Sequence, residues 1–138
     1  PIREGRFVIN PYGSFRSLYP LPVGDEDLGI RYPFLQLEHD ELVAIIGGYV
    51  VGSGPLKGKF VFGDGPSGRL FFVDLHVDNS QAQTWGIRYQ GEEMTLKELV
   101  GQDRVDLKFG LDAKKQLYLM SKSNGTVYRL VDNTIEIQ

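Results

Sequence analysis

Several residue types are scarce or missing in this sequence, and each absence excludes a class of chemistry. None of the 138 residues is cysteine, which removes disulfides, thiolate metal sites and thiol nucleophiles together. The only histidines are His39 and His76, whereas a histidine-based metal site generally needs more ligands and groups that orient them. The lack of cysteine does not indicate a compartment, because many exported proteins also lack it.

Long apolar runs and blocks of one charge are missing too. The longest apolar stretch, residues 42–51, contains Gly47 and Gly48 and is far shorter than the roughly 20 residues of a membrane-spanning helix. The chain has 15 basic and 18 acidic residues, interspersed without the basic stripe that binds nucleic acid. We therefore expect no membrane span and no nucleic-acid partner.

The length of the chain suits a single domain. The sequence begins at Pro1 without an initiator methionine or the basic and apolar segments of a secretory signal. Any targeting segment is therefore expected to have been removed or to belong to a part not present here.

From about residue 42 the sequence contains short runs rich in β-branched and aromatic residues, separated by Gly, Asn, Asp or Pro. Their spacing suits a meander of antiparallel strands better than alternating strands and helices. The fold class is therefore expected to be all-β. The predicted strands are residues 42–51, 59–63, 69–75, 83–89, 105–110, 116–121 and 126–131.

Two local signals are sharper than the rest. Thr95 as N-cap, Glu98 three residues later and Gly101 as a stop predict one short helix over residues 95–100. The pair Asn124-Gly125 predicts a β-hairpin with a type I′ turn, because that turn needs two positive φ angles.

Residues 1–40 differ in composition from the rest of the chain, with Pro11, Pro20, Pro22 and Pro33 and an acidic run at 25–27. These features predict an irregular, loop-rich N-terminal segment. Residues 6–10 could form a strand, and residues 32–38 an edge or extended segment, because Pro33 cannot donate a ladder hydrogen bond.

Two parts of the chain echo each other. GD at 63–64 followed by GRLFFVD at 68–74 is similar to GLD at 110–112 followed by QLYL at 116–119. The offset is close to the ~45 residues of a four-stranded propeller blade. We expect residues 41–138 to form two propeller-blade-like antiparallel sheets, the second lacking an outer strand. Because a closed propeller needs at least ~4 blades, this chain cannot close a ring alone.

Longer strings resemble the glucose/sorbosone dehydrogenase family of six-bladed β-propellers. They are AIIGGYVVG at 44–52, PLKGKFVFGD at 55–64, GRLFFVD at 68–74, DLKFGLD at 106–112, QLYLMSK at 116–122 and GTVYRL at 125–130. The resemblance covers roughly residues 32–131, in the order of the family's C-terminal region. It implies a partial six-bladed propeller from a periplasmic or secreted protein that oxidises sugars with pyrroloquinoline quinone (PQQ), with calcium in some members.

The same resemblance implies that the reactive centre lies elsewhere. The family's catalytic histidine and most of its cofactor contacts belong to earlier blades, so this chain would be an inactive C-terminal fragment, partnered by the remaining blades. The family commonly has an aromatic residue and an arginine where this chain has Val51 and Gly52. The alternative function is a non-catalytic binding module, which could self-associate through open edge strands.

Two glycine-rich stretches approach nucleotide-binding motifs. Residues 63–68 match G-x-G-x-x-G, but a β-rich run follows where a helix is required, so we expect a turn. Residues 53–59 approach a P-loop, but Ser53 replaces its first glycine and Phe60 replaces the residue that binds magnesium. We interpret the second match as chance.

The titratable candidates are weak. His39 is the better general base or ligand because carboxylates flank it, but no nucleophile motif accompanies it, so a solvated corner is favoured over a small hydrolase. His76 is expected at an exposed strand end. The acidic run at 25–27 lacks the ligand spacing of an EF-hand. Glu92 and Glu93 would point to opposite faces of a strand, which makes them a poor pair for glycoside chemistry.

Aromatic residues and one modification motif complete the candidates. Trp85, Tyr89, Tyr118 and Tyr128 could form a sugar platform, but we expect them to fill the core. Residues 124–126 form an N-glycosylation motif, although the hairpin turn explains them better.

Overall fold

The structure is a computed structural model that describes residues 23–29, 31, 33–37, 39–78, 80–131 and 134–137. The chain divides into two units, residues 1–36 and 37–138. In the first unit, a 3-10 helix, η1 (Asp25–Leu28), lies between Gly24 and Gly29, which both have positive φ. Residues 33–37 form no strand, and the predicted strand at residues 6–10 lies outside the described residues.

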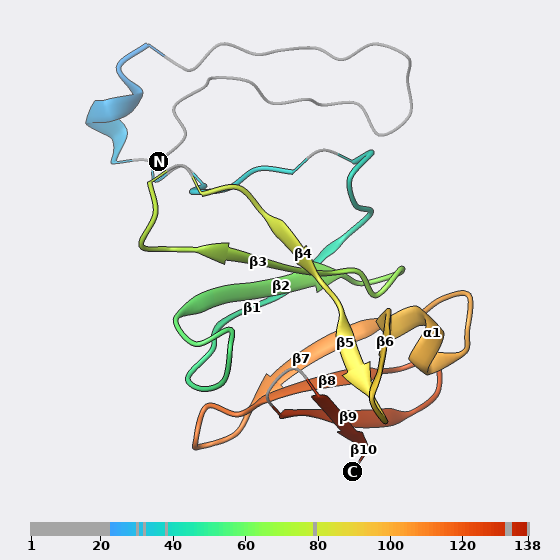
Figure 1. The fold of residues 1–138 in the computed structure, drawn as a ribbon. Coiled ribbons are helices and arrows are strands. Elements are labelled where there is room, and N and C mark those ends of the chain that lie inside the picture. Colours follow the sequence, from blue (N-terminus) through green and yellow to red (C-terminus); the bar gives the residue numbers. More distant parts are fainter. Residues whose placement is uncertain are drawn as a thin grey trace. The chain divides into compact units, whose positions relative to one another are not determined.

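The second unit begins with a four-stranded antiparallel meander, which we call the first sheet (Figure 1). Its strands follow chain order: β1 (Ile45–Val50), β2 (Lys59–Asp64), β3 (Leu70–Asp74) and β4 (Gln83–Trp85). The register shifts between Gly47 and Tyr49, which marks a β-bulge in β1. Strands were predicted at each of these places, and the structure confirms them.

A second antiparallel meander, the second sheet, contains β7 (Leu107–Leu111), β8 (Leu117–Ser121), β9 (Thr126–Val131) and β10 (Thr134–Ile137). A hairpin of β5 (Ile87–Tyr89) and β6 (Glu92–Met94) adds to its outer edge through one parallel bridge between Thr134 and Arg88. The expectation that this sheet lacks an outer strand is wrong, because β10 supplies one. The all-β, propeller-like arrangement with one short helix is confirmed.

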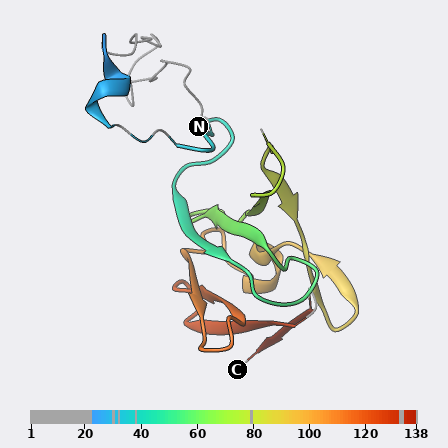
Figure 2. The same ribbon diagram turned by 90° about the vertical axis from the view of Figure 1, so that its left-hand side faces the viewer.

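The predicted strand 83–89 changes sheets part-way along. Its first half, β4, pairs with β3 in the first sheet. After Gly86 the chain continues as β5, which pairs with β6 and β10 in the second sheet. Figures 1 and 2 show this segment running from one sheet to the other.

The main core fills the space between the two sheets. Val61 and Leu70 from the first sheet belong to the same buried cluster as Leu107, Leu119 and other residues of the second sheet. Helix α1 (Leu96–Val100) adds two buried side chains, its first and last. The expected capping box is confirmed, since Glu98 and Thr95 each bond the other's backbone amide and Gly101 ends the helix. Among the described residues, no helix is long and apolar enough to cross a membrane.

The hairpin turns correct one prediction. In the loop between Ser121 and Thr126, which pair across the hairpin, Gly125 has a φ of 70° but Asn124 does not have a positive φ. The hairpin is confirmed, but its type I′ turn is wrong. A two-residue loop with both φ angles positive occurs instead at Gln90 (51°) and Gly91 (91°), between β5 and β6.

The sequence similarity between residues 63–74 and 110–119 also has a different structural basis from the expected repeat of a blade. The turn at Asp64 lies between β2 and β3, the second and third strands of the first sheet. The turn at Asp112 lies between β7 and β8, the first and second strands of the meander in the second. The similarity therefore relates two turns and does not superpose one blade-like sheet on the other.

Candidate functional site

The most elaborate polar arrangement is the turn at residues 63–68, which we call the Asp64 turn. The Asp64 side chain is only 1% exposed. Its carboxylate accepts hydrogen bonds from the amides of Val43 (3.0 Å), Ala44 (2.8 Å) and Ser67 (3.3 Å) and from the Ser67 hydroxyl. A buried carboxylate is stable only when it is bonded in this way.

Backbone hydrogen bonds extend the Asp64 turn to both sheets. The Gly65 amide donates to the Ala44 carbonyl (2.8 Å), just before β1. The Pro66 carbonyl accepts from Val105 and the Gly65 carbonyl from Leu107, each at 2.8 Å, where the chain enters β7. The turn thus joins three segments, and strand β3 follows it, so the turn interpretation of G-x-G-x-x-G is confirmed.

The electrostatics of Asp64 agree with a structural role. Burial raises the pKa of the carboxyl, but the hydrogen bonds from the Ala44 amide, the Ser67 hydroxyl and the Val43 amide outweigh it and leave the pKa below its ordinary value. The ionised side chain is occupied by internal donors. Asp64 therefore serves the fold and is a poor general base.

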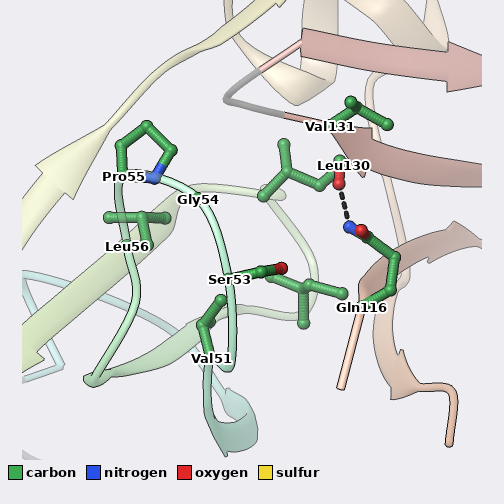
Figure 3. Close-up of a pocket in the computed structure, with 9 residues that line it drawn as sticks. Val51, Ser53, Gly54, Pro55, Leu56, Gln116, Leu130 and Val131 are labelled. Carbon is green, nitrogen blue, oxygen red and sulfur yellow. Dashed lines mark hydrogen bonds between the residues drawn. The ribbon is translucent and has the colours of Figure 1, made fainter. Parts of the chain in front are cut away.

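A hollow lies between the β1–β2 loop and the second sheet (Figure 3). Its space of about 340 Å³ includes open solvent. Ser53 and Gln116 are the polar side chains among its lining residues, and the Gln116 amide already donates to the Leu130 carbonyl. One exposed hydroxyl without a neighbouring base has no means of activation.

The P-loop match at residues 53–59 forms the wall of this hollow. It is a hairpin loop in which Val51 donates to the Lys59 carbonyl (3.0 Å) and Gly58 donates to the Val51 carbonyl (2.8 Å). Strand β2 follows, where a phosphate-binding loop needs a helix. The interpretation of this match as chance is confirmed.

The structure does not gather the two histidines into a site. His39 lies exposed in a turn. His76 is exposed just beyond the end of β3, as expected, and its amide donates to an Asp74 oxygen at 3.0 Å. Lys59 also bonds Asp74, and these two contacts lower the pKa of that carboxyl. No group of three or more His, Cys, Asp or Glu that could hold a metal occurs within the described part of the chain.

Comparisons with protein-family models, curated proteins and solved structures found no match for this chain.

Where the structure describes their side chains, the other carboxylates considered as candidates form no catalytic pair. Asp25 and Asp27 lie in the short helix η1. Glu93 pairs with Arg88 at 2.8 Å across the β5–β6 hairpin, whereas the adjacent Glu92 lies opposite Tyr89. This alternation agrees with the prediction that the two glutamates face opposite sides.

The four aromatic candidates separate into two groups. Tyr128, which is 1% exposed, belongs to the main core, and Trp85 and Tyr89 pack against it. Tyr118 is half-buried and pairs with Arg129, on the face of the second sheet turned away from that core. The core prediction therefore holds for three of the four side chains.

The structure shows what surrounds Val51 and Gly52, the two positions where the resemblance predicts an aromatic residue and an arginine. Val51 is buried, at 4% exposed, in the main core. A Cβ atom at Gly52 would lie 2.7 Å from the Cβ of Lys115, so this lysine occupies the space that a side chain at position 52 would need. Sequence reasoning missed this contact, because nothing in the intervening 62 residues, 53 to 114, signals it.

Proposed function

We propose that the chain is a C-terminal scaffold fragment of a sugar-dehydrogenase-like propeller, in which it shapes part of the ring and leaves the chemistry to earlier blades. The proposal rests on the ordered resemblance at residues 44–130 together with two facing antiparallel sheets. A periplasmic or secreted location follows from the same resemblance and is part of the proposal.

The observation that carries the proposal is where the resembling residues lie. A Cβ at Gly48 would be 1.9 Å from the Phe60 ring, and one at Gly63 would be 2.5 Å from Leu107. Asp64 bonds the segment before β1. Each of these residues is explained by close packing or by a joint between strands, which is the role expected of a shared scaffold.

A quinone site does not fit at positions 51 and 52. Val51 is buried in the core, and the place of a side chain at Gly52 is filled by Lys115. An arginine there would displace the lysine. Positions 51 and 52 therefore supply no charged side chain that could hold PQQ.

The test is direct. The purified 138-residue chain, incubated with PQQ, calcium ions and an aldose, should reduce an artificial electron acceptor no faster than the same mixture without the chain. Sugar oxidation dependent on both PQQ and the chain would overturn the scaffold proposal. An upstream reading frame without further blades would overturn the assignment to a larger propeller.

A second candidate function is a non-catalytic binding module that pairs through β1. This strand ends the first sheet, and Ile45 (54% exposed) and Val50 (47% exposed) leave apolar surface on it, which favours strand association. Light scattering after size exclusion tests it. A dimer that Ile45→Lys converts to a monomer supports this module, and a monomer at all concentrations contradicts it.

A further inference from the structure

The β8–β9 hairpin contains a chemically labile dipeptide. Asn124-Gly125 is the only Asn-Gly pair in the chain. In such a pair the glycine amide nitrogen can attack the asparagine side-chain carbonyl carbon, because glycine lacks a Cβ that would obstruct the ring. Both residues are exposed, and a Cβ built on Gly125 would find nothing within 4 Å. A five-membered ring therefore has room to form.

Two hydrogen bonds hold the Asn124 side chain. Its Oδ1 accepts from the Thr126 amide at 3.1 Å, and its Nδ2 donates to the Tyr128 hydroxyl at 2.7 Å. Tyr128 is itself anchored, since only 1% of it is exposed. The side chain must leave this arrangement before its carbonyl carbon can turn towards the Gly125 nitrogen.

We propose that Asn124 is a site of spontaneous deamidation and that the Tyr128 hydroxyl sets its rate by restraining the side-chain amide. In the reaction a bond forms between the Gly125 nitrogen and Cγ of Asn124, the nitrogen loses its proton, and the side-chain nitrogen leaves as ammonia. Water then opens the succinimide to aspartate or isoaspartate. No oxidant or reductant takes part.

The products would change this end of the second sheet. Either one adds a negative charge beside Tyr128, where the original amide donated a hydrogen bond. Isoaspartate also inserts an extra backbone carbon between Ser121 and Thr126, which pair across the hairpin. The modification would therefore weaken the pairing of β8 with β9 progressively as the protein ages.

The experiment compares deamidation of the full chain and of Tyr128→Phe during incubation at mildly alkaline pH, followed by peptide mass spectrometry. Losing one hydrogen bond of typical strength should accelerate deamidation about three- to tenfold. Tyr118→Phe, on the neighbouring strand, is the matched control and should retain the parental rate. Circular dichroism verifies that each variant is folded.

Three results would overturn the proposal. An unchanged rate in Tyr128→Phe would show that the hydroxyl exerts no restraint, and a slower rate would show that it assists the departure of ammonia. Deamidation at Asn79 or Asn133 in preference to Asn124 would remove the site itself. A synthetic peptide of residues 121–128 gives the unrestrained rate, which the folded parent chain should not reach.

Discussion

The two sheets differ in how they use their faces. The first sheet is apolar on both: Val61 and Leu70 enter the main core, while Phe62 and Phe71 stack on the opposite face with ring centroids 5.4 Å apart. The second sheet buries one face, and its other face carries Lys108, Tyr118, Met120, Val127 and Arg129. The first sheet therefore buries side chains on both faces, whereas the second buries them on one.

The paired turns sharpen this difference. Asp64 ends strand β2 and Asp112 follows strand β7, and each accepts hydrogen bonds from backbone amides of its own turn. Asp64, however, is buried and also bonds the segment before β1, whereas Asp112 is exposed. The same local motif therefore joins separate segments at Asp64 and forms only a simple turn at Asp112, because different residues pack around the two turns.

The largest expected loss of stability comes from filling the space beside Gly63 in the Asp64 turn. In Gly63→Ala the new Cβ would lie 2.5 Å from Leu107 Cδ2 and 2.8 Å from the Arg69 carbonyl oxygen, so the variant should lose about 3 kcal/mol of unfolding free energy. In the matched variant Gly110→Ala the nearest atom is the flexible Met120 Cε at 3.3 Å. Urea denaturation should show less than about 1 kcal/mol of loss there; equal losses would contradict the distinction.

The two aspartates provide the next comparison. Asp64→Asn places an amide donor against the donors of Ser67, so unfolding should become easier by about 2 kcal/mol. Asp112→Asn keeps an oxygen for the Lys114 and Gln116 amides and should change stability by less than about 0.5 kcal/mol. Thermal and urea unfolding would measure both, and an Asp112→Asn loss as large as that of Asp64→Asn would break the comparison.

The pH dependence of folding stability should reflect the ionisation of Asp64. Because its pKa is lowered in the folded state, its contribution to stability is present above the unfolded pKa of about 3.9 and is lost as pH falls through the lower folded value. Unfolding midpoints between neutral and strongly acidic pH should therefore drop less in Asp64→Asn than in the parent chain. Parallel curves for the two proteins would show that other carboxylates, such as Asp74, dominate.

The smallest effect on stability is expected at Lys115, which takes the place in the second turn that Gly68 takes in the first. Gly68 has a φ of 74°, and a Cβ there would lie 2.7 Å from Val105. At the corresponding place Lys115 has a φ of 61°. Lys115→Gly relieves backbone strain but adds freedom to the unfolded chain and uncovers Gly52, so stability should change by no more than about 0.5 kcal/mol. A larger loss in chemical denaturation would show that the lysine packing over Gly52 stabilises the second sheet.

Local chemistry made much of the fold predictable. Thr95, Glu98 and Gly101 fixed the short helix because a capping box needs only neighbouring residues. Strand β6, with the sequence EEM, lacks the β-branched residues that mark strands, and it was missed. The type I′ turn was misplaced because Gln90, unlike asparagine, gives no signal of a positive φ.

The joint between the sheets could not be predicted in the same way. The sequence GDGPSG at 63–68 predicts a turn, but the hydrogen-bond partners of this turn include Val43 and Val105, which are far from it along the chain. Hydrogen bonds of that kind depend on the assembled sheets and leave no pattern in any short window. The covered position of Gly52 escapes prediction for the same reason, since Lys115 reaches it only after both sheets have formed.

The strand that changes sheets at Gly86 has a consequence for how such chains can be divided and recombined. One half of it pairs with β3 and the other half with β6 and β10. A proteolytic cut or a genetic fusion between the sheets would leave each product with only its own part of a strand that was continuous. Shuffling these two sheets as separate modules should therefore fail, and a viable boundary for exchange would have to keep residues 83–89 together.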